Sequence, residues 1–206
     1  MIDLSSRIYG VFFPSVTFST NEERIHLTFD DGPHPAATPI VLNILNKFSI
    51  KATFFLLGHH AQQSPELART INTEGHTVGN HSFSHLNLVF RQKHVIRREI
   101  ETTNDIIAEV TGVRPTLFRP PFGFFDLRTL SIVESLGMRL VHWSNDLRDF
   151  EIRTTEKSII NSTRRIDRGS IILLHDSEFT VNKMSTILPT IIMALQDRGL
   201  TFDSLH

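Results

Sequence analysis

Short apolar runs alternate with amphipathic stretches along nearly the whole chain. The run at residues 171–174 contains no polar residue, which is typical of a strand buried on both faces of a parallel sheet. The stretches between the runs are long enough for helices, so the pattern predicts repeated β-α units. The predicted strands are residues 25–31, 52–58, 76–80, 116–119, 138–144, 170–175 and 200–204.

The clearest helical period lies in residues 91–110, where apolar residues recur every three or four positions among charged neighbours. Glycines follow several of the amphipathic stretches, as is typical of helix C-termini. The predicted helices are residues 37–48, 64–74, 91–110, 126–136, 155–166 and 183–198. Seven strands with helices between them predict a closed or nearly closed α/β barrel, with an open doubly wound sheet as the alternative.

The composition narrows the classes of function. The chain has 206 residues, of which 40% are hydrophobic and 21% charged, and its net charge is -1. This length suits one domain, and there is no basic excess to attract nucleic acid. No stretch reaches the length of a membrane span. The chain has eleven histidines and no cysteine, so a bound metal must use His, Asp or Glu.

Residues 1–24 precede the first predicted strand, and we expect them to form an extension packed on the main domain at 25–206. An apolar run follows Arg7, as it does in some export signals. Asp3, Pro14 and the lack of a small-residue cleavage pattern argue against a signal peptide.

Unusual polar segments follow five of the predicted strands. In a parallel α/β protein the carboxyl ends of the strands open onto one face, so these segments are expected to converge there. The segments are Asp30 and Asp31, then "NHSFSH" at 80–85, "FRPPFG" at 118–123, "WSNDLRDF" at 143–150 and "LLHD" at 173–176.

His81 and His85 are four residues apart, and one helical turn would place both imidazoles on the same side. Taken alone, such a pair is as often a surface or capping feature. With an aspartate from a neighbouring strand end it becomes a site of two histidines and one carboxylate, which leaves positions open for water and substrate. One of Asp30 and Asp31 would then bind the metal, and the other would take a proton from the bound water. Spacing alone does not assign the two roles.

Four further residues are candidates at the same rim. Arg119 could orient the second aspartate through its forked donor, although a surface ion pair is the alternative. His175 could act as a general acid with Asp149 as its partner, or it could simply bond to backbone. Trp143 could line a sugar-binding groove, although an aromatic residue in a buried strand is more often part of the core. The other histidines form no convincing constellation.

These five segments, in this order, resemble the motifs of the polysaccharide deacetylase family, the NodB-like carbohydrate esterases of family four. The similarity runs from about residue 25 to the end of the chain. It implies a distorted (β/α) barrel with about seven parallel strands, and 25–206 as its catalytic domain. It also implies one divalent metal, usually zinc, held by Asp31, His81 and His85.

The resemblance further implies roles at the reaction centre. Asp30 would be the general base and His175 the general acid, with Arg119 orienting Asp30 and Asp149 tuning His175. The backbone N–H of Phe122 would stabilise the oxyanion, and Leu174 would contact the acetyl methyl. Two positions depart from the family pattern, because Phe122 stands where Tyr is common and Phe150 where Trp is common. We expect both changes, like Trp143, to bear on substrate choice.

The sequence therefore predicts a metal-dependent hydrolase that removes acetyl from N-acetylated sugars of a peptidoglycan-like or chitin-like glycan. An O-acetyl xylan esterase with the same site is the alternative. A non-catalytic carbohydrate-binding homologue is less favoured, because every catalytic position is present. The expected partner is an acetylated glycan, and no obligate protein partner is evident.

Acetylated glycans are mostly outside the cytoplasm, yet no convincing export signal is visible, so the location of the protein stays open. The chain has no P-loop, dinucleotide fingerprint or Gly-x-Ser-x-Gly elbow.

Overall fold

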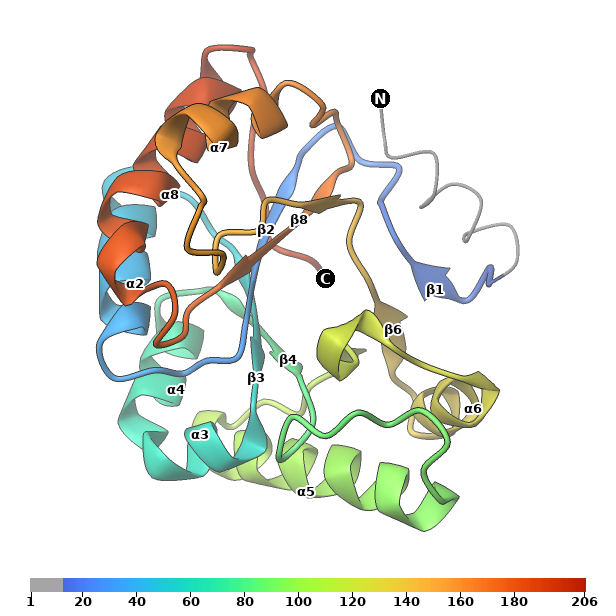
Figure 1. The fold of residues 1–206 in the computed structure, drawn as a ribbon. Helices are drawn as coiled ribbons and strands as arrows, with labels where there is room; N and C mark the ends of the chain where they lie inside the picture. The colour runs from blue at the N-terminus through green and yellow to red at the C-terminus, as the bar shows by residue number, and fades with distance from the viewer. Residues whose placement is uncertain (1–12) are drawn as a thin grey trace.

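The apolar runs form one parallel sheet in the computed structural model, which describes residues 13–206. In this part of the chain the sheet has eight strands in the order β1-β6-β5-β4-β3-β2-β8-β7 (Figure 1). Each neighbouring pair is parallel. The strands are β1 (Val16–Thr17), β2 (His26–Asp30), β3 (Thr53–Leu56), β4 (Thr77–Asn80), β5 (Leu117–Phe118), β6 (Arg139–Val141), β7 (Asn145–Asp146) and β8 (Ile171–His175).

The predicted α/β fold with a barrel-like parallel sheet is confirmed. The sheet curls into a half-barrel whose edge strands are β1 and β7. Six of the seven predicted strands are present as β2 to β6 and β8. The two edge strands, each of two residues, were not predicted.

The predicted strand at 200–204 is wrong. This segment meets the sheet only at an isolated bridge between Ile25 and Phe202. The reason lies in the neighbours of β2, which pairs with β8 from His26 onward and with β3 from Thr28 onward. Both edges of β2 are therefore filled, and the C-terminal segment can pair only just before the strand begins.

The predicted helices are confirmed to within a few residues, and they cover the outside of the sheet (Figure 1). Helix α6 begins directly after Asp126, whose side chain accepts the N–H groups of Arg128 and Thr129. One short helix, α3, was not predicted. The helices are α2 (Ala37–Lys47), α3 (Gly58–Gln63), α4 (Pro65–Thr73), α5 (Lys93–Thr111), α6 (Leu127–Ser135), α7 (Glu156–Thr163) and α8 (Val181–Gln196), with a 3-10 turn η1 (Pro121–Gly123).

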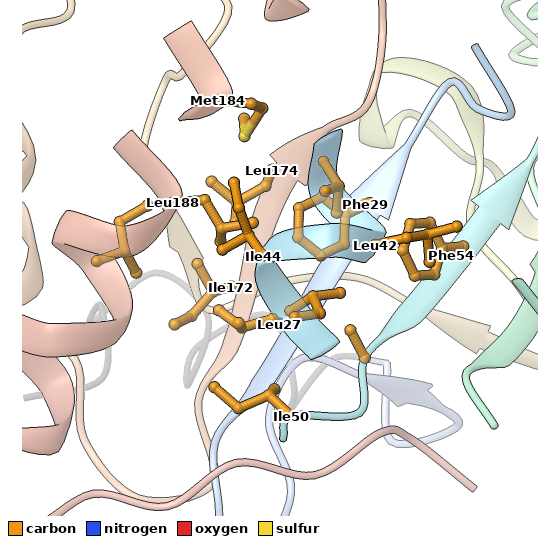
Figure 2. Packing of buried hydrophobic residues seen from close by; sticks show 14 of the residues in the cluster. Leu27, Phe29, Leu42, Ile44, Ile50, Phe54, Ile172, Leu174, Met184 and Leu188 are labelled. Atoms are coloured by element: carbon orange, nitrogen blue, oxygen red, sulfur yellow. The ribbon is translucent and has the colours of Figure 1, made fainter. Parts of the chain in front are cut away.

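The largest apolar cluster lies between the central strands and the helices α2 and α8. Figure 2 shows Leu27 and Phe29 of β2 and Leu174 of β8 packed toward Ile44 of α2 and Leu188 of α8. All five side chains are buried. Burial on this scale holds β2 and β8 rigidly side by side, which fixes the positions of the residues at their carboxyl ends.

The N-terminal expectations fall partly outside the described residues. Residues 1–12, on which the argument about an export signal rests, lie outside the described residues. Within the predicted extension 1–24, β1 pairs with β6 and so belongs to the same sheet. Among residues 13–206, no helix combines the length and apolar character needed to cross a bilayer.

Candidate active site and metal centre

The carboxyl ends of β2 and β8 bring the first two candidate residues together. Asp30 is the last residue of β2 and is paired in register with His175, the last residue of β8. Asp31 follows directly in a left-handed conformation, with φ of 74°. That turn directs the adjacent carboxylates to different partners, so the two aspartates need not compete for one position.

Asp31, His81 and His85 form a group whose potential ligand atoms all lie within 4.8 Å of one another. Asp31 Oδ1 is 3.6 Å from His81 Nε2 and 3.3 Å from His85 Nε2. This oxygen is buried and has no hydrogen-bond partner among the described residues. A buried carboxylate oxygen aimed at two imidazole nitrogens fits a metal ligand. The donor set therefore suits a divalent ion with open coordination positions.

His81 is also held in a form that can bind a metal ion. Its Nδ1–H donates to the carbonyl oxygen of Arg119 at 2.7 Å, which leaves the Nε2 lone pair facing Asp31. Burial lowers the pKa of His81 to about 3, against the opposing charge of Asp31. The imidazole is therefore neutral near pH 7, which is the form that binds metals.

The helical turn expected across His81 and His85 is wrong, because residues 81–85 form a loop. Ser82 and His85 have φ of 70° and 57°, which a helix does not allow. Asn80 Oδ1 accepts the N–H of Ser82, and the Glu99 carboxylate of α5 accepts the N–H groups of the next two residues. The two imidazoles meet because these bonds shape the loop.

The structure brings Arg119 to Asp30, as the sequence predicted. Arg119 Nη1 donates to Asp30 Oδ1 at 2.8 Å and to Thr28 Oγ1 at 2.7 Å, while Nη2 donates to the carbonyl oxygen of His142. The guanidinium is fully buried and lies 4.1 Å from the centre of the Phe55 ring. Burial lowers its pKa, but Asp30 opposes that effect, and arginine stays cationic.

His175 and Asp149 form the second predicted pair. His175 Nδ1–H donates to Asp149 Oδ1 at 2.8 Å, and the backbone N–H of His175 donates to Oδ2 at 2.8 Å. Burial alone would lower the pKa of His175, but the hydrogen bond and charge of Asp149, together with Asp30 and Asp31, raise it to about 9. The imidazolium therefore persists at neutral pH.

A cavity of about 550 Å³ lies over these groups. Phe122, Trp143 and Phe150, which were predicted as pocket residues, all line it. The predicted contact of Leu174 is wrong, because Leu174 points into the core (Figure 2). Alternation along β8 places Leu173 on the cavity side with His175. The complete lining is Asp30, Asp31, His81, His85, Phe122, Gly123, Phe124, Trp143, Asp146, Phe150, Leu173, His175, Ser177 and Phe179.

Sequence reasoning missed several parts of the site. Phe124 and Phe179 expose 57% and 66% of their surface at the rim, yet a phenylalanine in a loop gives no sequence signal of its own. The sequence assigns His60 no role, but its Nδ1–H donates to the carbonyl oxygen of Asp31 at 2.7 Å. It assigns none to His142 either, although the ring of His142 stacks on Trp143 with 3.9 Å between the ring centres. Only the folded chain brings these residues to the motifs.

A second cavity of about 450 Å³ adjoins the first. The two share Asp31, His85, Ser177 and Phe179. The second cavity continues past His34, His60 and Gln63, so the metal-ligand group lies between two hollows.

Comparison with known proteins agrees with this geometry. Residues 18–141 match the model of the polysaccharide deacetylase family. The chain belongs to the polysaccharide deacetylase family. The match includes the segments that carry Asp30, Asp31, His81, His85 and Arg119. Asp149 and His175 lie beyond it, and their place in the site comes from the structure.

The relatives of this chain include named enzymes. A chitooligosaccharide deacetylase of Azorhizobium caulinodans is 36% identical, with 95% of this chain and 99% of that protein covered. The peptidoglycan-N-acetylglucosamine deacetylase PgdA of Listeria monocytogenes is 34% identical over 96% of this chain. The chain spans 42% of the length of PgdA.

Among solved structures, the CE4 family pseudoenzyme BA3943 of Bacillus anthracis superimposes with a TM-score of 0.84 at 28% identity, covering 93% of this chain and 68% of that one. A BA3943 mutant with restored enzymatic activity has the same TM-score. Inactive and reactivated forms thus share the fold equally with this chain, so activity has to be argued from the site residues.

Proposed function

We propose that this protein is a metal-dependent hydrolase that removes the N-acetyl group from N-acetylglucosamine-type sugars of a glycan and releases acetate. One observation carries the proposal. The metal-ligand group of Asp31, His81 and His85 shares a cavity with the two acid-base candidates, Asp30 and His175. The named activities of the relatives support a peptidoglycan-like or chitin-like substrate.

Asp31, His81 and His85 would hold a divalent ion, and zinc suits a donor set of two imidazoles and a carboxylate. When bound, such an ion supplies Lewis-acid polarisation and lowers the pKa of water. The hydrogen bond from His81 to the Arg119 carbonyl keeps the ligand nitrogen unprotonated. The chain itself thus maintains the ligand in its binding form.

Asp30 is the general base in this proposal. Arg119 occupies Asp30 Oδ1, whereas Oδ2 faces the metal-ligand group at 3.8 Å from His81 Nε2. Oδ2 is therefore the oxygen that accepts the proton of the attacking water. The salt bridge to the buried guanidinium fixes the orientation of the Asp30 carboxylate.

His175 is the general acid. Its Nδ1 is held by Asp149, so Nε2–H is the group that protonates the departing amine as the carbon–nitrogen bond breaks. An amine is a poor leaving group unless it is protonated, so an imidazolium at neutral pH is the form the reaction needs. The proton balance then closes, with one proton taken by Asp30 and one given by His175.

The walls of the cavity would select the sugar. We assign the oxyanion donor to the backbone N–H of Phe122, and the apolar walls to Trp143 and Phe150. The adjoining second cavity extends the hollow beyond the metal-ligand group. We take this extension as support for a substrate within a glycan chain over a free monosaccharide.

Acetate release is the direct test. The protein is incubated with chitin oligomers, peptidoglycan fragments and acetylated xylan, each with zinc and with a chelator. We expect release from an N-acetylated glycan that the chelator abolishes and added zinc restores. Release from acetylated xylan alone would instead favour an O-acetyl esterase. A protein that binds no divalent metal and releases no acetate from any glycan would refute the proposal.

A further inference from the structure

Asp176 is a buried acidic residue that the proposed reaction does not use. It follows His175 directly, and its side chain is fully shielded from solvent. Its Oδ1 atom has no hydrogen-bond partner among residues 13–206. A buried oxygen without a hydrogen-bond partner lowers the stability of the fold. The presence of such an oxygen beside the reaction centre therefore needs a physical explanation.

The carboxyl group of Asp176 lies against the backbone of Gly32. A Cβ atom at position 32 would be 2.3 Å from Asp176 Oδ2 and 2.5 Å from Oδ1. Such distances are far inside van der Waals contact, so a side chain at position 32 would fit only if the Asp176 carboxyl group moved. Gly32 is not among the residues with positive φ. The glycine of "TFDDGP" is therefore needed for close packing against Asp176 and not for a left-handed turn.

Asp176 is itself held to both ends of the turn that carries Asp31. Its backbone N–H donates to the carbonyl oxygen of Asp30 at 3.1 Å. The hydroxyl group of Thr38 donates to Asp176 Oδ2 and accepts the backbone N–H of His34 at 2.8 Å. These bonds connect the carboxyl group to the residues before and after the Asp31–Gly32 pair.

The opposite side of the turn is held by α3 and the residue before it. Leu57 N–H donates to the carbonyl oxygen of Gly32 at 2.9 Å, and His60 donates to that of Asp31 at 2.7 Å. Asp31 has φ of 74°, a conformation that a residue with a side chain adopts at a cost. Such a conformation persists where surrounding contacts determine it from several sides.

We propose that Asp176 is a positioning residue for Asp31. Its carboxyl group packs on Gly32 and, through Thr38, fixes the turn that directs Asp31 Oδ1 toward His81 and His85. This inference rests on the proposed metal-dependent function. It assigns Asp176 no contact with the substrate, so its effect appears in metal affinity before it appears in the chemical step.

Zinc affinity measured by calorimetry tests the proposal. Asp176→Ala removes the packing group, and we expect zinc to bind at least about tenfold more weakly, as when a group that orients a metal ligand is lost. Asp176→Asn retains the shape and an acceptor for Thr38, so its affinity should stay within about threefold of the wild type. Leu188→Ala, in the core contact of α8, is the control, since it destabilises the fold away from the site and should leave zinc affinity unchanged.

Gly32→Ala provides a second, independent arm. Alone, it should weaken zinc binding at least about tenfold, because the new methyl group collides with the carboxyl group. In the Asp176→Ala background the same substitution should have a much smaller effect, since the space is then free. Thr38→Val removes the hydroxyl group that bonds to Asp176 and His34, so it should weaken zinc binding severalfold. If Asp176→Ala does not fold, Thr38→Val and Gly32→Ala test the proposal in its place.

The outcomes separate the two proposals. Wild-type protein that binds no zinc would overturn both the proposed function and this inference. Zinc binding that is normal in the wild type and equally strong in Asp176→Ala would overturn only the inference. An Asp176→Asn protein as weak as Asp176→Ala would also overturn it, because charge and not packing would then control the site. If Gly32→Ala weakened zinc binding as much in the Asp176→Ala background as in the wild type, the inference would also be overturned.

Discussion

The two oxygens of Asp30 have different surroundings, and this leads to the first prediction. Oδ1 receives Arg119, while Oδ2 faces the metal-ligand group. Asp30→Asn should leave zinc affinity within about threefold, because Asp30 is not a ligand in this assignment. Its kcat should fall by about 10² to 10⁴, the range of a lost general base. Calorimetry and acetate release measure the two effects separately.

Asp31→Asn is the matched comparison for that experiment. It changes the adjacent carboxylate in the same way, but this carboxylate carries the oxygen that lies 3.3 Å from His85 Nε2. Zinc affinity should fall strongly in Asp31→Asn. If Asp30→Asn lost zinc and Asp31→Asn retained it, the assigned roles of base and ligand would be reversed.

The pKa of His175 predicts a pH dependence. Burial opposes the charged form, but Asp149, with help from Asp30 and Asp31, raises the pKa to about 9. The acid is therefore protonated below that pH, and kcat for amide hydrolysis should fall as the pH rises through about 9. In Asp149→Asn the supporting charge is gone, so this decline should begin at a lower pH. Profiles of kcat between pH 6 and 10 compare the two proteins.

The same residue separates amide from ester hydrolysis. An alkoxide sugar needs less protonation than an amine does, so His175→Ala should lose N-deacetylation far more than O-deacetylation. Acetate release from an N-acetylated and an O-acetylated glycan measures both activities in one preparation. Equal losses on both substrates would contradict the role of His175 as the acid for the leaving amine.

At the scale of elements, β3 and β4 are joined at their beginnings by a buried histidine. His76, directly before β4, accepts the N–H of Ala52 through Nδ1 at 3.1 Å. Burial, with Lys51 as a lesser cause, lowers the pKa of His76 to about 4. Between pH 6.5 and 4, His76 therefore binds a proton more readily in the unfolded chain than in the folded protein. The contribution of His76 to stability is present above pH 6.5 and is lost as the pH falls to 4.

This loss can be measured as a free energy of unfolding. A pKa difference of this size corresponds to roughly 3 kcal/mol at most. His76→Asn places an uncharged acceptor near the Ala52 N–H, so its unfolding free energy should fall less between pH 7 and pH 5 than that of the wild type. Urea titrations at both pH values provide the comparison, and identical decreases in the two proteins would contradict the assignment.

For the whole molecule, metal binding should be visible as thermal stability. A ligand that binds only the folded state at 100 times its Kd adds about 2.7 kcal/mol, which corresponds to roughly 5–10 °C in Tm for a domain of this size. We expect that increase with zinc and its reversal with a chelator. His85→Ala should abolish the increase, and His94→Ala, an exposed histidine of α5, should retain it. An equal increase in both variants would place the bound zinc elsewhere.

Much of the element order could be predicted from the sequence, because a buried parallel strand and an amphipathic helix each leave a local periodic pattern. Three short segments were not predicted, namely β1, β7 and α3. The segment at 200–204 had the pattern of a strand but no free sheet edge to pair with. Pairing depends on which edges other segments have already filled, and no local window contains that information.

The sequence by itself determined the residue types of the site, because the family motifs place Asp30, Asp31, His81, His85, Arg119, Asp149 and His175 at the ends of predicted strands. The tertiary structure decided how these groups are used. It replaced the expected helical turn at His81 with a loop held by Glu99, and it placed Leu173 instead of Leu174 at the cavity. It also set Asp176 against Gly32. These outcomes depend on contacts between residues far apart in the chain, whereas the motifs depend only on neighbours in sequence.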